Sequence, residues 1–231
     1  MNCINQQLKK IYMEVKNKTD HFMKRCDELW IEDGESVIQY CYCPDEYADN
    51  NIKIMCVGQE ANGWGYEKEV EESMTFMKEF IYGESRPIFF LFIHEFESII
   101  NGEKPFNKSH IFYSNIFRTT CDTSPTKLLE NENLTMEYLD DIQTLSAEIS
   151  AANPDILLFL TGPHYDRYIS TIYKGVRFEQ ASAAYDTRAL AILVHGSLPQ
   201  NTFRLYHPGY ANRNREHLWG DIMREIKRLA G

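Results

Sequence analysis

The chain has 231 residues, of which 43% are hydrophobic and 25% are charged, and its formal net charge is −10. These values exclude a disordered chain, a coiled coil and a collagen-like fibre, and the length suits one large domain over residues 1–231. The longest apolar runs are far shorter than a membrane span, and the N-terminus lacks the apolar stretch of a signal peptide. We therefore expect a cytoplasmic protein that does not contact a membrane.

The first 50 residues predict a helical extension that packs on the rest of the chain. Residues 2–17 and 20–32 have the apolar spacing of two amphipathic helices, with Asp20 as a candidate cap for the second. Residues 33–51 are rich in turn-forming residues and predict a loop.

Beyond this extension, apolar runs and amphipathic stretches alternate along the chain. The runs predict strands at 52–57, 111–115, 155–160 and 202–206, and 176–194 predicts a hairpin or two short strands. The amphipathic stretches predict helices at 67–82, 87–101, 135–153, 163–173 and 213–229. This alternation predicts an α/β protein, a three-layer α/β/α sandwich with a central, mostly parallel sheet of about four strands.

In such sheets the binding crevice lies at the carboxyl ends of the strands, which directs attention to four turns. The glycine-rich loop 58–65 carries Glu60, whose carboxylate is suited to orienting a water molecule or stabilising a cation. Asn115 ends the second strand, and its amide is suited to reading the edge of a base. The turn at 160–163 shapes the crevice. His207 follows the last strand and is suited to bonding a carbonyl or an anionic leaving group.

Each of these residues also has a plain structural interpretation. Glu60 fits an ordinary surface glutamate, Asn115 fits a turn asparagine, and His207 fits a turn that merely contains histidine. The loop after the first strand matches neither the dinucleotide-binding glycine pattern nor the P-loop. Nothing in the sequence indicates secretion, so we expect free thiols. The cysteines and histidines lack the spacing of metal ligands, so we expect no metal.

Taken together, the strand-end motifs resemble those of the uracil-DNA glycosylase superfamily. The matching segments occur in order within residues 52–230: IKIMCVGQE, IFYSN, NPDILLFLTG and TFRLYHPG. The resemblance implies a uracil-DNA glycosylase-like fold and an enzyme of DNA repair that flips a damaged base out of DNA and hydrolyses its N-glycosidic bond. It implies no cofactor, because a pocket, a water molecule and electrostatic stabilisation suffice.

The resemblance also implies roles for individual residues. Glu60 falls where many members have the water-activating residue, Asn115 where an asparagine reads uracil, and His207 where a histidine stabilises the leaving base. Gln59 would offer its backbone amide to the base. Asn62 takes the place of a tyrosine that excludes thymine in uracil-specific members, and Trp64 is a candidate to stack on the base, as are Tyr66 and Phe76.

DNA is the expected partner, and the resemblance places the segment after His207 in its minor groove. We expect Gly209 to Arg215 to form a loop on the crevice rim, with Gly209, Asn212, Arg213 and Arg215 as DNA-binding residues. Charge is uneven along the chain: residues 1–160 have a net charge of −14 and residues 161–231 a net charge of +4. The alternative for these arginines is that they pair with the acidic part of the chain.

Two other functions remain open. Ala61, Gly209 and the acidic balance favour a catalytically inactive superfamily member that binds a nucleotide, nucleic acid or a protein partner. A hydrolase of free nucleosides would need no basic DNA track. The sequence leaves the oligomeric state open.

Overall fold

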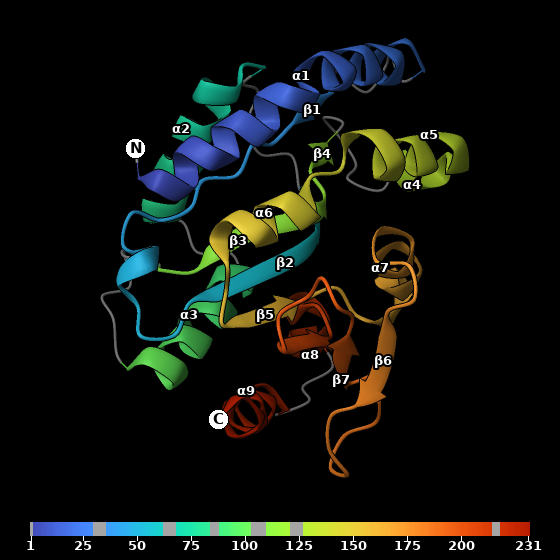
Figure 1. The fold of residues 1–231 in the computed structure, drawn as a ribbon. Coiled ribbons are helices and arrows are strands. Elements are labelled where there is room, and N and C mark those ends of the chain that lie inside the picture. Colours follow the sequence, from blue (N-terminus) through green and yellow to red (C-terminus); the bar gives the residue numbers. More distant parts are fainter. Residues whose placement is uncertain are drawn as a thin grey trace.

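A computed structural model gives the fold of residues 2–29, 36–61, 68–83, 88–102, 110–120, 127–213 and 218–231 (Figure 1). Its strands are β1 (Val37–Ile38), β2 (Ile54–Glu60), β3 (Phe112–Phe117), β4 (Thr119–Thr120), β5 (Ile156–Phe159), β6 (Arg177–Gln180), β7 (Leu190–Val194) and β8 (Asn201–Leu205). Its α-helices are α1 (Cys3–Leu29), α2 (Val70–Tyr82), α3 (Ile88–Asn101), α4 (Lys127–Glu130), α5 (Glu132–Glu137), α6 (Leu145–Ala152), α7 (Asp166–Ile172), α8 (Pro208–Arg213) and α9 (Leu218–Ala230). Short 3-10 turns η2 (Tyr47–Asp49) and η4 (Pro163–Tyr165) and a π-helix η3 (Tyr138–Ile142) complete the described elements.

The central sheet is mostly parallel, which confirms the predicted α/β class. Six strands lie in the order β3-β2-β5-β8-β7-β6, and the first four run parallel to one another. The prediction of about four strands was too low, because the segment 176–194 forms a hairpin that adds β7 and β6 antiparallel at one edge. The four parallel strands therefore end together at one side of the sheet.

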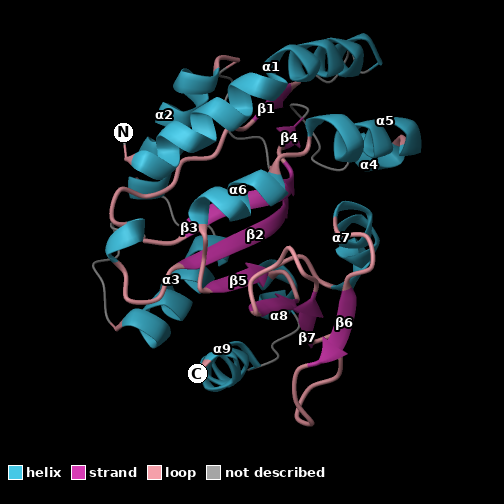
Figure 2. Ribbon diagram, in the orientation of Figure 1, coloured by secondary structure: helices cyan, strands magenta, loops and turns pink. Residues whose placement is uncertain are grey.

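Helices cover both faces of the sheet (Figure 2). Successive residues of a strand point to opposite faces, and β3 shows this clearly. Ser114 bonds to Glu148 of α6, whereas Tyr113 packs against Phe89 of α3. The long helix α1 packs on α6, and α3 contacts α8 and α9 on the other side. No helix within the described ranges is both long and apolar enough to cross a membrane.

The N-terminal prediction was wrong in two respects. One continuous helix, α1, replaces the two predicted helices, and its buried residues lie on both sides of residue 20. Asp20 is not a cap but pairs with Lys16 at 2.5 Å on the exposed side. The predicted loop 33–51 contains β1, which pairs antiparallel with β4, and the turn η2.

The predicted helix 135–153 was also wrong, since it is broken into α5, η3 and α6. The break at Thr144 has a tertiary cause. The Thr144 hydroxyl donates to Glu148 and accepts from Arg118, and these contacts hold Thr144 in a non-helical backbone conformation directly before α6. Asn153 ends α6 with a left-handed φ of 44°, directly before Pro154.

The remaining boundary errors concern the strand ends. Strand β2 includes Gly58, Gln59 and Glu60, which belonged to the predicted loop 58–65, because β2 pairs in parallel with β3 as far as Glu60. Helix α8 occupies the described part of the predicted rim loop, residues 209–213, and begins at Pro208. The predicted closing helix 213–229 therefore begins later, as α9 at Leu218.

Candidate active site at the carboxyl ends of the parallel strands

The four parallel strands bring the predicted site residues to one end of the sheet. Glu60 is the last residue of β2, Asn115 lies in β3 opposite Gly58, and His207 stands two residues after β8. Glu60 follows Gly58 by two residues, so the two lie roughly 7 Å apart on the same face of β2. Residues from three separate strands thus stand at the end of the sheet where the sequence predicts the crevice.

Asn115 is held firmly at this end of the sheet. Its side chain is buried, and its Oδ1 accepts a hydrogen bond of 2.7 Å from the hydroxyl of Tyr113, which is also buried. Gly58 makes the arrangement possible, because a Cβ at that position would stand 2.3 Å from Asn115 Oδ1. This contact fixes the rotamer of the amide and leaves Nδ2 as its donor group.

A phenylalanine that the sequence analysis did not single out joins these residues. The ring of Phe89, at the start of α3, lies 5.0 Å from the ring of Tyr113 and 5.4 Å from that of His207. A Cβ at Gly58 would also stand 3.4 Å from Phe89 Cε2. Phe89 therefore connects the residues of β2 and β3 with the histidine after β8.

His207 has a defined tautomer when it is neutral. Its Nδ1 accepts a hydrogen bond of 3.1 Å from the backbone N–H of Gly209, so this nitrogen is the unprotonated one. The proton of the neutral ring is then on Nε2, which makes that atom a hydrogen-bond donor. The start of α8 supplies the contact, and the Tyr210 N–H also bonds back to the His207 carbonyl at 2.8 Å.

Glu60 is a carboxyl group in largely apolar surroundings. Burial raises its pKa to about 7. The hydroxyl of Tyr165, in η4, donates a hydrogen bond to Oε1, whereas Oε2 is buried and has no hydrogen-bond partner within the part of the chain that the structure describes. A carboxyl group that titrates near neutrality and has one unsatisfied oxygen is suited to general base catalysis.

Gln59 has a structural contact across the crevice. Its side-chain Nε2 donates to the carbonyl of Thr161 at 2.7 Å, which ties β2 to the turn after β5. The predicted use of its backbone amide stays a prediction. Gly162 in the same turn has a φ of 68°, a conformation that favours glycine.

Several predicted residues lie outside the described part of the chain. These are Asn62, Trp64, Tyr66 and Arg215, and the side chains of Asn212 and Arg213. Gly209 is described, and its contribution is the hydrogen bond to His207. Phe76 stacks on Phe80 within α2 at 6.2 Å, as expected of a packing residue.

The sequence contained a signal for two aromatic residues of the candidate site, Tyr113 and Tyr165, that the sequence analysis did not use. Tyr113 is in the quoted IFYSN motif, two positions before Asn115, and this spacing places both on one face of a strand. Tyr165 follows the predicted turn at 160–163. Phe89 had no such signal, because a phenylalanine in an amphipathic helix is typical of any core.

The basic C-terminal segment is largely neutralised by its own contacts. In α9, Arg224 pairs with Asp221 and Arg228 with Glu225, three residues away in each case. Arg204 is buried, and its Nε lies 3.0 Å from Asp166 Oδ1. These acidic partners all lie within residues 161–231 and not in the acidic first 160 residues. Because the side chains of Arg213 and Arg215 lie outside the description, both interpretations of these two arginines stay predictions.

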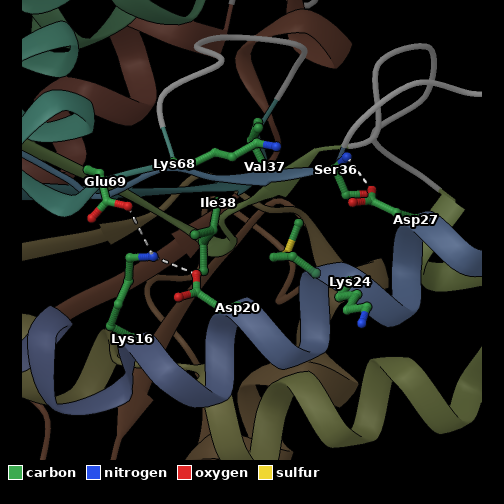
Figure 3. A pocket seen from close by; sticks show the side chains of 10 residues that line it. Lys16, Asp20, Lys24, Asp27, Ser36, Val37, Ile38, Lys68 and Glu69 are labelled. Atoms are coloured by element: carbon green, nitrogen blue, oxygen red, sulfur yellow. Dashed lines mark hydrogen bonds and ion pairs between the residues drawn. The ribbon is translucent and has the colours of Figure 1, made fainter.

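A pocket elsewhere in the fold has a different character. It has a volume of about 370 Å³ and lies between α1 and β1 (Figure 3). Lys16 stands between Asp20 and Glu69 at its wall, and Asp27 accepts the backbone N–H of Ser36 at 2.6 Å. None of the site residues predicted from the sequence lines it. Within the described ranges, no cluster of three histidine, cysteine or acidic side chains is arranged to hold a metal ion.

The close approach at Gly58 leads to a first prediction. Gly58→Ala places a methyl group against the Asn115 amide, 2.3 Å from Oδ1, so the amide must move from its bond with Tyr113. We expect a loss of about 1–3 kcal/mol in unfolding free energy, measured by urea denaturation, and a shifted side-chain amide signal of Asn115 in NMR spectra.

Gly196→Ala is the matched control, because a Cβ there meets no atom within 4 Å. It should change neither quantity by much. An unmoved Asn115 signal in Gly58→Ala would contradict the close packing at the crevice floor.

In comparisons with known proteins, neither a protein-family model nor a curated protein matches this chain.

Proposed function

We propose that the protein is a DNA glycosylase-like hydrolase that cleaves the N-glycosidic bond of uracil or a related deaminated base in DNA. The resemblance of its strand-end motifs to the uracil-DNA glycosylase superfamily supports this proposal, and so does the geometry of the crevice. The observation that carries it is the convergence on Phe89 of Gly58, Asn115 through Tyr113, and His207. In the proposal, Asn115 supplies a donor for a base edge and His207 supplies a donor for the leaving group.

In the proposed reaction, ionised Glu60 activates the nucleophile. A water molecule attacks the anomeric carbon of the flipped nucleotide, and Oε2 accepts the proton that this water loses. The carbon–nitrogen bond breaks, and its electron pair leaves with the base. The products are the free base and an abasic sugar that carries the hydroxyl group of the water.

His207 and Asn115 act on the departing base. Nε2–H of neutral His207 donates a hydrogen bond to a carbonyl oxygen of the base, which becomes more negative as the bond breaks. Nδ2–H of Asn115 donates to a second carbonyl, a group that deamination creates where an amino group stood. Phe89 supplies an apolar surface between the two contacts. This set of donors favours oxo bases over amino bases.

A second candidate is a binding protein without hydrolytic activity. The observations that favour it are Ala61 and Gly209, which stand where many members of the superfamily have proline and serine, and the net charge of −10. Such a protein would keep the Asn115 and His207 contacts to a base or nucleotide and lack the chemical step.

The test is incubation with labelled single-stranded and double-stranded oligonucleotides that carry one uracil, hypoxanthine or xanthine. Alkaline treatment then cleaves the strand at any abasic site. We expect cleavage at one or more of these bases at pH 8, where Glu60 is ionised, and none with cytosine or adenine at the same position.

Free deoxyuridine and deoxyinosine are assayed in parallel. Hydrolysis of these nucleosides alone would replace the DNA glycosylase with a nucleoside hydrolase. Binding of the oligonucleotides without cleavage, from folded protein at every pH between 6 and 9, would replace it with the binding protein.

A further inference from the structure

We propose that Tyr165 positions Glu60, holding Oε1 so that Oε2 is the oxygen that receives the proton of the attacking water. This inference rests on the proposed function, in which Glu60 is the general base. The two carboxylate oxygens have different surroundings, and this difference is its starting point. Tyr165 donates to Oε1, while Oε2 is buried with no hydrogen-bond partner among the described residues.

An unsatisfied buried carboxylate oxygen requires an explanation. Buried polar atoms are nearly always hydrogen-bonded, because the loss of hydration is costly without a partner. At the mouth of a crevice between parallel strands, a water molecule of the reaction is the partner that meets this need. The Tyr165 bond restricts rotation of the carboxylate, so the same oxygen always faces this position.

The fold holds Tyr165 rigidly enough to play this part. It ends the turn η4, which begins at Pro163 after the left-handed Gly162. Its side chain is only 8% exposed, and its ring lies 6.3 Å from Phe117 and 5.4 Å from Tyr168. Phe117 is the β3 neighbour of Glu60 in the sheet register, so the same strands locate both the carboxylate and its donor.

Among the described residues, the charged neighbours of Tyr165 have partners of their own. Asp166, the next residue, is engaged with Arg204 at 3.0 Å. Tyr168 receives a hydrogen bond from Arg167. A hydroxyl that donates to a carboxylate stabilises its charged form and lowers its pKa, against the effect of burial.

The experiment measures the pKa of Glu60 directly, by NMR titration of its ¹³C-labelled carboxyl carbon in the full-length protein. Glu60→Gln assigns the signal. In Tyr165→Phe we expect the pKa to rise by about one unit, because the hydrogen bond to the charged form is lost. The acidic limb of the pH–rate profile for base release should move upward by the same amount.

Tyr168→Phe is the matched control, because it removes a neighbouring hydroxyl from the same aromatic cluster without touching Glu60. It should leave the pKa and the limb in place. Site-specific 3-fluorotyrosine at position 165 keeps the ring and strengthens the donor, so it should lower the pKa of Glu60. This second variant also keeps the test decisive where Tyr165→Phe fails to fold.

The two proposals fail in different ways. An unchanged Glu60 pKa in both position-165 variants overturns the role of Tyr165, whatever the activity. A pKa that moves as expected supports the positioning contact, and absence of base release from all variants at every pH then counts against the glycosylase function alone.

Discussion

Arg118→Met is expected to lower the unfolding free energy by about 3–5 kcal/mol, the largest effect on stability among the changes described here. Arg118 directly follows β3 and is 1% exposed. It donates to the carbonyl of Gln39 at 2.9 Å and to Thr144 Oγ1 at 2.7 Å, and its Nε lies 3.5 Å from Glu148 Oε1. Its guanidinium also covers the ring of Tyr12 at 5.0 Å.

The expected loss of stability is large because Arg118→Met leaves the buried Glu148 carboxylate without its cation. Glu148 is fully buried and would keep only the hydroxyls of Ser114 and Thr144, both at 2.6 Å. A buried carboxylate without its cation is strongly unfavourable. The pairing is also visible in the pKa of Arg118, which burial acts to lower but the Glu148 carboxylate raises above its ordinary value.

Urea denaturation with Arg177→Met as the control measures this prediction. Arg177 forms an ion pair with Glu179 on the exposed strand β6, so its loss should cost less than about 1 kcal/mol. The double variant Arg118→Met with Glu148→Met should recover part of the stability, because both charges are then removed. A loss below about 1 kcal/mol in Arg118→Met would contradict the buried ion pair.

Glu60→Gln is expected to slow base release about 100- to 10,000-fold, the range typical of a lost general base. The amide keeps the shape of the side chain and the acceptor for Tyr165, but it takes no proton from water. In the wild type, release should rise with pH and level off above a pKa of about 7. The variant should lack this rise, and an unchanged profile would exclude Glu60 as the base.

Glu60→Gln is expected to stabilise the fold above neutral pH, although it slows base release. Burial raises the pKa of Glu60 from 4.5 to about 7, so folding favours the protonated form. The stability that this provides is complete below about pH 4.5 and is lost as the pH rises through 7. Glu60→Gln should therefore be more stable than the wild type at pH 8, by about 1–3 kcal/mol, and nearly equal to it at about pH 4. Thermal unfolding at the two pH values measures the difference.

The strand pattern and the chemistry at strand ends predicted much of the site. Apolar runs such as 54–57 and 156–159 are bounded by turn residues, so the parallel strands were recognisable from local sequence. Because such strands end on one side of a sheet, Glu60, Asn115 and His207 could be grouped without a structure. Their environment could not be predicted in the same way.

Long-range contacts explain what the sequence did not predict. The break at Thr144 depends on Arg118, which lies 26 residues earlier in the chain. Tyr165 stands 105 residues from Glu60, and Phe89 reaches His207 from a helix whose spacing is that of any core helix. No periodicity links such partners, since only folding places them together.

The proposed hydrolysis of the N-glycosidic bond is tested most directly by quantifying the free base and the abasic strand by mass spectrometry, in a single turnover at pH 8. The substrates are the uracil, hypoxanthine and xanthine oligonucleotides, with wild-type, Glu60→Gln and Tyr168→Phe proteins. We expect one free base per cleaved strand from at least one substrate. Wild type and Tyr168→Phe should release the base at similar rates, and Glu60→Gln should release it at least about a hundredfold more slowly. No free base from any substrate, or equal release by Glu60→Gln, would contradict hydrolysis at this site.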